Sequence, residues 1–574
     1  MVFANFIPRI IFFLKYLLLL KERSEEDMTH LTDKKKLTIM LAIMTALFFA
    51  AINQTIIGIA MPRIIATLGG IDYYSWAITI YLLTSTVASI LVGKISDIYG
   101  RKPFLLLGIG VFMVGAVLSG LAIDIVQLIT YRTIQGLGAG MILSTVFTAV
   151  GDLYEPRERA KWSGVLSAVF GISSVAGPLL GGYIVDHLDW RWVFWIFLPL
   201  GVIAFILIFI HFPKVTKREG ESIDYWGSLF LTSTIVPLLL ALSLAGDGPT
   251  KYAWGSWQII GLFFITIVAL LLFILIQLNV KNPVLPLNLF KNSVFTVSNL
   301  VGFFFNAGMM GAIIYVPFFV QGVKGISPTV AGYVSMPLSI AMLVTSALSG
   351  QYISKTGTYK KMGILGLLVM TFGIVGLYSM TSATPIYQLI LYLIVLGLGL
   401  GAAMPVFTLT VQNAVAPQQI GVATASSQLF RNLGGTIGIA VMGSMMSASI
   451  AKKMTELAGT NEQQAIPVST DPVLAEKLAL FSNPQNLLDQ PKIEAALNSL
   501  SPESQVVFSN VLDRVQEALS YAITTTFLVG AIMAAIAVVL ACFLKEISLR
   551  SGKNIESKVA SPDTNRTNNK TSEC

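Results

Sequence analysis

The sequence predicts an all-α polytopic membrane protein with about fourteen membrane-spanning helices, and its composition and apolar runs indicate this fold class. Hydrophobic residues make up 55% of the 574 residues, charged residues only 12%, and the mean hydropathy is +0.75. Soluble domains carry roughly 25% charged residues. The apolar residues form repeated runs of about 20, long enough to cross a hydrocarbon core as helices. The composition therefore argues strongly against a water-soluble enzyme.

Charged residues, glycines and prolines interrupt these runs and give the expected helix boundaries. The first seven helices are expected at residues 37–62, 74–93, 103–122, 125–148, 161–184, 191–211 and 225–244. The other seven are expected at residues 256–278, 294–320, 329–350, 361–380, 385–408, 420–447 and 520–544. An even number of crossings places both chain termini on the same side of the membrane.

The basic residues are distributed unevenly between the two sides of this arrangement. The loops on one side carry Lys94, Arg101, Lys102, Arg157, Arg159, Lys161, Lys214, Lys217, Arg218, Lys281, Lys291, Lys355, Lys360 and Lys361. The opposite short loops carry only Arg63, Arg191, Lys251 and Lys324. Because short cytoplasmic loops are rich in Lys and Arg, we expect the first side and both termini to be cytoplasmic in a plasma-membrane protein. Basic residues spread between apolar runs do not indicate nucleic-acid binding, despite the net charge of +8.

The chain divides into five expected segments: an N-terminal cytoplasmic segment 1–36, a six-helix bundle 37–211, two additional helices in 212–280, a second six-helix bundle 281–544 and a cytoplasmic tail 545–574. The apolar stretch 6–20 is interrupted by charges, which favours an interfacial anchor or a dispensable extension before Met28 over a signal peptide. Residues 449–520 form a large extracellular loop, more readily a packed cap than a binding domain. Short amphipathic helices are expected in it at 472–480 and 493–500.

Cofactor and metal chemistry find no support in the sequence. The two cysteines, Cys542 and Cys574, give neither a disulfide framework nor a metal cluster. The three histidines, His30, His187 and His211, stand at expected helix ends. We therefore expect no cofactor, no metal and no catalytic site.

Residues 93–102 read GKISDIYGRK and close the cytoplasmic end of the second expected helix. Gly93 and Gly100 permit a tight turn and close helix approach. Asp97 can pair with Arg101 or lie against a helix N-terminus of the other bundle, and Lys102 completes the basic end. A degenerate echo, GQYISKTG, occupies residues 350–357, as expected of duplicated halves that rock about a midplane site. The alternative is a solvated loop of mixed charge.

Arg132 lies in the segment YRTIQGLGAG (131–140), inside an otherwise apolar helix. An ionised side chain within a membrane costs several kcal/mol and marks function by default. The nearest acidic residue on the same helix is Asp124, about two turns away. The alternative is an arginine that snorkels to the interface.

Residues 171–182 read GISSVAGPLLGG, and small residues with a proline make a pliable, closely packed helix through Gly171, Gly177, Pro178, Gly181 and Gly182. Together with the two preceding motifs, in this order, the segment resembles the major facilitator superfamily. The two inserted helices and the long loop before the last helix resemble its fourteen-helix drug:proton antiporter branch, in particular the bacterial multidrug exporters. The resemblance covers residues 37 to about 545.

This resemblance implies a major facilitator fold of two six-helix bundles plus two inserted central helices. It also implies a monomeric transporter in the lipid bilayer that exports hydrophobic or amphiphilic small molecules in exchange for protons. In that family the 93–102 motif is a gating element, the fourth-helix arginine belongs to coupling, and the 171–182 motif is the antiporter helix.

The sequence departs from that branch in the first helix, where an aspartate is usual and Asn53 stands instead. Asn53 cannot titrate, and no Asp or Glu lies in the middle of any expected helix, whereas Arg132 and Arg431 do. Proton coupling must then use groups nearer helix ends. The candidates, besides Arg132, are Asp72, Asp97, Asp124 and Asp152.

Candidate substrate-cavity residues are the polar and aromatic residues of the expected helices. They are Phe48, Phe49, Asn53, Gln54, Trp76, Tyr81, Gln135, Phe304, Phe305, Met309 and Arg431. The aromatic residues among them are equally suited to face lipid. Two other functions compete with drug export: transport of a lipid or an anionic metabolite by the same fold, favoured by the two arginines without carboxylate partners, and a membrane-embedded enzyme or sensor. An enzyme needs a cluster of acids, histidines or metal ligands at one membrane face, and the sequence offers none.

Overall fold

The computed structural model describes residues 32–154, 156–213, 224–245, 252–280, 283–415, 419–459, 472–478, 487–488 and 490–546. Within these ranges fourteen helices are long and apolar enough to cross a membrane, which confirms the predicted number and the all-α fold class. The predictions for the chain before residue 32 and after residue 546 concern residues outside those the structure describes.

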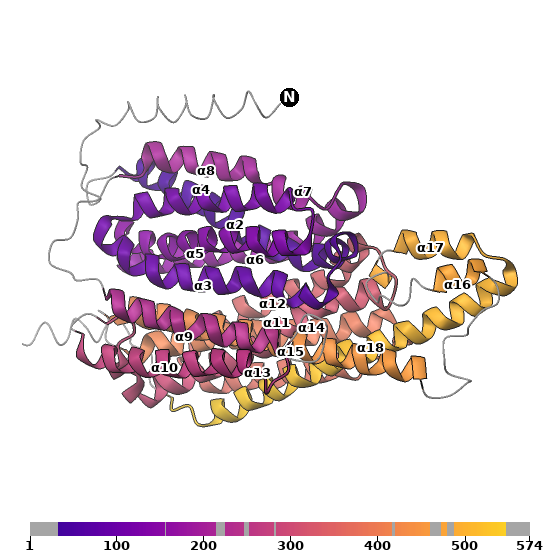
Figure 1. Cartoon of the computed structure of the whole chain (residues 1–574). Coiled ribbons are helices and arrows are strands. Elements are labelled where there is room, and N and C mark those ends of the chain that lie inside the picture. Colours follow the sequence, from indigo (N-terminus) through magenta and orange to yellow (C-terminus); the bar gives the residue numbers. More distant parts are fainter. Residues whose placement is uncertain are drawn as a thin grey trace, which may run out of the picture.

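The helices form two bundles that contact each other directly, and a pair that lies between them in the sequence packs beside them (Figure 1). The first bundle consists of α2 (Asp33–Leu68), α3 (Tyr74–Tyr99), α4 (Arg101–Gly120), α5 (Ile125–Leu153), α6 (Pro156–His187), α7 (Trp192–Trp195) and α8 (Leu198–His211). The pair is α9 (Tyr225–Leu244) and α10 (Trp257–Asn279). The second bundle consists of α11 (Ser293–Gly322), α12 (Pro328–Thr356), α13 (Lys360–Tyr378), α14 (Ile386–Asn413), α15 (Ile420–Gly459) and α18 (Pro502–Cys542). The short elements are η3 (Ile71–Tyr73), η4 (Leu287–Lys291), α16 (Pro472–Leu478) and α17 (Gln490–Asn498).

The two bundles pair their helices in the same order. In the first, α3 and α4 pack on α5, and α2 packs on α6 and α8. In the second, α12 and α13 pack on α14, and α11 packs on α15 and α18. This correspondence fits the internal repeat that the echo at 350–357 indicates.

The sixth helix, expected at 191–211, is confirmed as one membrane span over Trp192–His211, with a short break between α7 and α8 where Pro199 in the first turn of α8 has no N–H to bond back to α7. The largest errors in the expected boundaries are at the other end of the chain, where α15 continues to Gly459 instead of ending at residue 447 and the last helix starts earlier than expected. The last helix begins at Pro502 instead of residue 520, because polar residues of its first turns lie outside the apolar window while Phe508, Val511 and Val515 bury an apolar stripe. The short helices expected near 472–480 and 493–500 are confirmed by α16 and α17.

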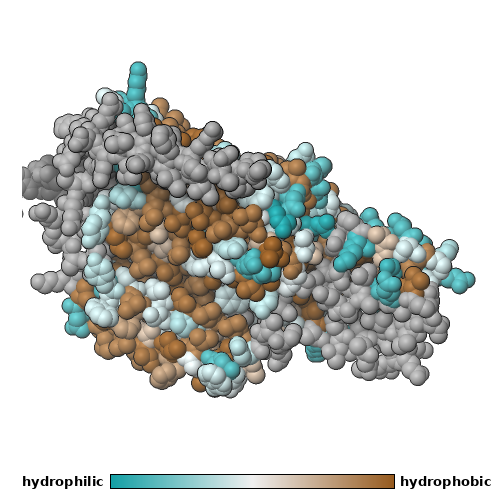
Figure 2. Space-filling model, turned by 45° about the horizontal axis from the view of Figure 1, so that its top comes forward, coloured by the Kyte–Doolittle hydropathy of each residue, from teal (hydrophilic) through white to brown (hydrophobic). Residues whose placement is uncertain are grey.

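A projection extends beyond one end of the bundles, where α16 and α17 stand beside the first half of α18 (Figure 1). We call this the hairpin end, and the opposite end, where α2 begins and α18 ends, the termini end. Lys453 on α15 pairs with Glu456 at 2.7 Å and lies 5.0 Å from the ring centroid of Tyr521 on α18. Hydrophobic side chains cover the face over the bundles, and hydrophilic ones gather toward the projection (Figure 2).

The inserted pair packs against both bundles through α9, which contacts α3 and α15, whereas α10 packs on α9. Apolar side chains of α10 face outward, with Trp257 79% and Phe264 66% exposed, as expected of a helix facing lipid. The buried carboxylate of Asp224 caps α9 at Gly227 N (2.7 Å) and accepts a hydrogen bond of 2.6 Å from Gln277 of α10. The pair is thereby fastened at its termini end.

Candidate functional site

The centre of the first bundle contains a fully buried polar network around Arg132 of α5. The side chain is 1% exposed, and its Nε donates a hydrogen bond of 2.7 Å to the backbone carbonyl oxygen of Ala77 on α3. Its guanidinium carbon lies 4.7 Å from the ring centroid of Tyr81, also on α3. The backbone and aromatic contacts hold the guanidinium inside the bundle, so Arg132 does not snorkel to the interface.

The network continues from Arg132 to the first transmembrane helix. The guanidinium donates to Gln135 Oε1 at 3.4 Å, and Gln135 Nε2 donates to Asn53 Oδ1 at 2.9 Å. A guanidinium can only donate, so Gln135 must turn its oxygen toward Arg132 and its amide nitrogen toward Asn53. Asn53 must then accept with its oxygen. Its Nδ2 is left buried without a hydrogen-bond partner among the described residues.

Every polar partner that the structure gives Arg132 is neutral. Asp124, the nearest acidic residue on α5, is the N-cap of that helix and accepts a hydrogen bond of 2.8 Å from Gln127 N. The structure therefore does not bring Asp124 and Arg132 together. The side chains of Asp72, Asp97 and Asp152 lie outside the described side chains.

Arg431 of α15 occupies a comparable setting in the second bundle. It is 8% exposed and donates to Thr408 Oγ1 of α14 at 2.8 Å and to Gln428 Oε1 at 2.6 Å. Asn306 of α11 donates to its backbone carbonyl oxygen at 2.6 Å. Arg132 in the first bundle and Arg431 in the second are thus both buried guanidinium groups that donate to uncharged partners.

The other expected cavity residues divide into two groups. Gln54, Trp76 and Phe304 are half-buried. Phe49 packs edge-on against Phe112 at 4.8 Å, and Phe305 stacks on Phe407 at 6.4 Å, so both fill the interior of a bundle. Met309 is buried in the core cluster that contains Phe305.

The segment 171–182 lies where α6 meets both α2 and α12. A Cβ on Gly177 would lie 2.7 Å from Thr55 Cβ of α2, and one on Gly181 would lie 3.0 Å from the carbonyl oxygen of Ile56. Toward α12, a Cβ on Gly171 would lie 2.7 Å from Leu343 Cδ1, and one on Gly182 would lie 2.6 Å from Thr329 Cα. We call this contact of α6 with α12 the seam. Only hydrogen at these positions permits such close approach.

Pro178 provides the seam with a hydrogen-bond acceptor. A proline has no N–H, so the carbonyl oxygen of Ser174, four residues earlier, lacks its helical donor. The hydroxyl of Ser339 on α12 donates to that oxygen at 2.9 Å. One turn of α6 thereby bonds across the seam instead of within its own helix.

Further hydrogen bonds join the two bundles toward the hairpin end. Thr329 N donates to Asp186 Oδ2 at 2.7 Å, and Gln321 Nε2 donates to the carbonyl oxygen of Ile59 at 2.9 Å. Tyr74 OH donates to the carbonyl oxygen of Ile314 at 2.9 Å. The bundles are therefore held together at the hairpin end in this structure.

The 93–102 motif lies at the termini end, with Gly93 and Asp97 on α3 and Lys102 on α4. Gly100 has φ 89°, a conformation that favours glycine, so the chain can turn there between α3 and α4. Arg101 donates to Ser96 Oγ at 2.7 Å and to the carbonyl oxygen of Gly93 at 3.4 Å. Lys102 donates to the carbonyl oxygen of Phe212 at the end of α8, at 2.6 Å. The motif thus fastens three helices at one end of the first bundle.

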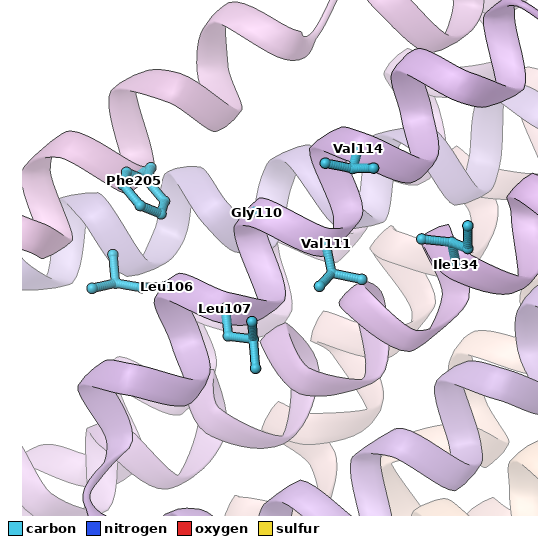
Figure 3. A pocket seen from close by; sticks show the side chains of 7 residues that line it. All are labelled: Leu106, Leu107, Gly110, Val111, Val114, Ile134 and Phe205. Atoms are coloured by element: carbon cyan, nitrogen blue, oxygen red, sulfur yellow. The ribbon is translucent and has the colours of Figure 1, made fainter. Parts of the chain in front are cut away.

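A pocket on the first bundle is separate from the polar network around Arg132. Leu106, Leu107, Gly110, Val111 and Val114 of α4 line it, with Ile134 of α5 and Phe205 of α8 (Figure 3). All of its lining residues are apolar. It offers no group that would orient a polar ligand, and Arg132 and Asn53 are not among its lining residues. No group of three or more His, Cys, Asp or Glu within the described ranges could hold a metal ion.

Several contacts were not anticipated from the sequence. Asp124 with Gln127 forms a capping pattern at a helix start, a signal that the sequence does contain. Asp224 similarly precedes an apolar run. The partners Thr408, Gln428 and Asn306 carry no comparable signal, because polar residues of separate helices meet only when the bundle is packed.

Comparison with known proteins places this architecture among transporters. A family model described as Major Facilitator Superfamily matches residues 43–439. The multidrug transporter protein MdtP of Bacillus subtilis (strain 168) is 36% identical over 522 residues, covering 91% of this chain and 95% of that protein. Multidrug resistance protein 3 of the same organism is 29% identical over 521 residues, covering 91% and 97%. A crystal structure of a bacterial homolog to the human lysosomal transporter Spinster, inward-facing and unoccupied, has a TM-score of 0.61 at 16% identity, covering 91% of this chain and 100% of that one.

Proposed function

The chain belongs to the major facilitator superfamily, and from this premise we propose that it exports hydrophobic or amphiphilic compounds as a proton-coupled secondary transporter. It is a multi-pass membrane transporter, and its family and fold are those of transporters rather than enzymes. Two relatives that align over nearly their whole length are named as multidrug proteins, which supports drugs and other toxic compounds as the substrates.

The seam between α6 and α12 is the observation that carries this proposal. Secondary transporters expose one site alternately to two sides by rocking one bundle against the other. Glycines without side chains form the seam, and the described residues join the bundles by hydrogen bonds across it and toward the hairpin end. Such a contact can be closed in one state and separated in another. The buried network at Arg132 lies in the bundle on one side of this contact.

We propose the termini end as the cytoplasmic end, in a plasma membrane. The basic loop residues that gather at that end support this orientation. The projection with α16 and α17 is then extracellular. A single chain contains both bundles, so we propose a monomer as the transporting unit.

Protons are proposed as the coupling ion, exchanged at a carboxylate near a helix end. Asp72, Asp124 and Asp152 are the candidates, with Arg132 as the charged group of the same bundle. Asp97 with Gly93, Gly100, Arg101 and Lys102 is proposed to control opening at the termini end. The hydrogen bonds of Arg101 and Lys102, which join α3, α4 and α8 there, support this role for the motif.

Efflux from cells tests the proposal. Cells with and without the protein are loaded with a panel of cationic, neutral and anionic fluorescent amphiphiles, and retention is followed over time. We expect faster loss of some members with the wild type, and no acceleration with Gly182→Val, because the new side chain would meet Pro328 and Thr329. Gly261→Val is the matched control, since a Cβ there meets nothing within 4 Å. Equal retention of every compound with and without the protein would refute export.

A further inference from the structure

From the polar network, and on the premise of the proposed function, we infer that the transported compounds include amphiphiles with an anionic or hydrogen-bond-accepting head, and that Asn53 selects for this head. The three observations that carry the inference are the direction of the hydrogen bonds, the unpaired amide nitrogen of Asn53 and the sign of the buried charge.

The direction of the hydrogen bonds leaves a donor available. Arg132 donates to Gln135, and Gln135 donates to Asn53, so the chain of donation ends at Asn53 Nδ2. That atom is buried and has no partner among the described residues. Buried polar groups in proteins are nearly always hydrogen-bonded, and an amide nitrogen can be satisfied only by an acceptor. A carboxylate, phosphate or carbonyl oxygen of a bound compound supplies one.

The positive charge near the site also favours a compound with an anionic head. Arg132 and Arg431 bring positive charge into the two bundles, and the described partners of both side chains are uncharged. No Asp or Glu stands in the middle of an expected membrane-spanning segment in this sequence, and no carboxylate is among the described hydrogen-bond partners of the Arg132 side chain. A desolvated cation would meet only like charge there, whereas an anion would be attracted.

Asn53 is the position at which this preference can be changed. Replacing it by Asp keeps the shape of the side chain and its acceptor for Gln135 Nε2, exchanges the free donor for an acceptor and adds a negative charge. The site would then offer a cation the partner it lacks. Asn53 is thus a specificity-determining residue by this inference.

The experiment compares two probes that share one ring system, anthracene carboxylate and (anthracenylmethyl)trimethylammonium. Full-length protein is purified and placed in liposomes, and binding and transport of each probe are followed by anthracene fluorescence. We expect the wild type to prefer the carboxylate by at least about tenfold, the ratio that about 1.4 kcal/mol gives. Asn53→Asp should reverse the preference.

Asn299→Asp is the matched control, because Asn299 is equally 1% exposed but lies on α11, where its Nδ2 donates to Phe295 O of its own helix and has no other partner among the described residues. It should leave the preference unchanged. Asn53→Ala deletes the donor without adding charge, so it should weaken carboxylate binding without a gain for the ammonium probe. This second variant keeps the test valid where a buried carboxylate prevents folding.

The inference is overturned where the wild type takes the ammonium probe at least as well as the carboxylate, or where Asn53→Asp and Asn299→Asp shift the preference equally. Selective binding of the carboxylate without transport of either probe would instead contradict the proposed function and leave the recognition site standing. The two failures are thereby distinguishable.

Discussion

The hydroxyl of Ser339 on α12 donates a hydrogen bond of 2.9 Å to the carbonyl oxygen of Ser174 on α6, the oxygen that Pro178 leaves without a helical donor. A residue that weakens α6 internally thus provides a bond between bundles. Replacing a bond within α6 by a bond between the bundles matters for a transporter, because a bond across the seam can be broken and remade while both helices remain intact.

Pro178→Ala should destabilise the closed hairpin end. The backbone N–H of the new alanine can donate to Ser174 O within α6, so it competes with the Ser339 hydroxyl for that oxygen. One hydrogen bond contributes about 1 kcal/mol, so the ratio of closed to open molecules should fall about fivefold. Cysteine cross-linking of Asp186→Cys with Thr329→Cys, whose parent residues are joined by a 2.7 Å hydrogen bond, measures that population. Pro237→Ala, in the inserted helix α9, should leave cross-linking unchanged. A cross-linking yield unaffected by Pro178→Ala would contradict this role of the proline.

Arg132→Lys should reduce transport by at least about tenfold while the protein still reaches the membrane. A lysine keeps the charge but cannot bond Ala77 O and Gln135 Oε1 with one planar fork while it stacks on Tyr81. Transport per molecule in liposomes, with melting temperature in detergent, measures the effect.

Arg191→Lys is the control for Arg132→Lys. Arg191 also bonds a backbone oxygen, that of Ala122, and lies 4.5 Å from the ring centroid of Trp190, but it stands at the bundle surface and pairs with Asp189. Its replacement should cost less than about threefold. Equal losses for the two variants would indicate a general effect of removing a guanidinium rather than a role for Arg132.

The sequence was sufficient to find the residues that break the pattern of their surroundings. Arg132 stands out as a charge in an apolar helix, and Gly182 as part of a run of small residues around a proline. The contacts of these residues could not be predicted. Arg132 donates to the backbone oxygen of Ala77, and Gly182 faces the Cα atom of Thr329. Every residue has these backbone atoms, so the sequence does not distinguish which of them will be contacted. Asp124 could be identified from the sequence as the acidic residue nearest to Arg132 on the same helix, but its contact could not: the carboxylate caps its own helix, since a cap needs only local geometry.

Asp97→Asn should reduce transport strongly without loss of membrane expression. The residue belongs to the last turn of α3, next to the turn at Gly100 where Arg101 and Lys102 join α3, α4 and α8. A carboxylate there can contact the opposite bundle in one state and lose that contact in the other. Asp189→Asn, a surface carboxylate at the hairpin end, is the control. Full transport by Asp97→Asn would remove Asp97 from the gate.

The hairpin end should face the outside of the cell. In a chain with Cys542→Ser and Cys574→Ser, a cysteine introduced as Val506→Cys should react with a membrane-impermeant maleimide in intact cells, because Val506 is 60% exposed on the projecting part of α18. Lys361→Cys, at the start of α13 on the opposite end, should react only after permeabilisation. The reverse pattern of labelling would invert the topology.

The last prediction concerns the coupling proton. Asp124 caps α5 through Gln127 N at 2.8 Å, and asparagine caps a helix about as well as aspartate. Asp124→Asn therefore removes the titratable group and preserves the local structure, which makes it a clean test of proton exchange at this position.

In liposomes with an acidic lumen, an antiporter should accumulate an exported amphiphile as protons leave. We expect Asp124→Asn to abolish the dependence on the pH gradient while exchange of labelled for unlabelled substrate continues. Asp189→Asn, which replaces a surface carboxylate and keeps an oxygen for the 2.9 Å hydrogen bond from Arg191 N, should keep the pH-driven accumulation. Accumulation by Asp124→Asn at the wild-type rate would assign the proton to another group, and wild-type transport indifferent to the gradient would exclude proton coupling altogether.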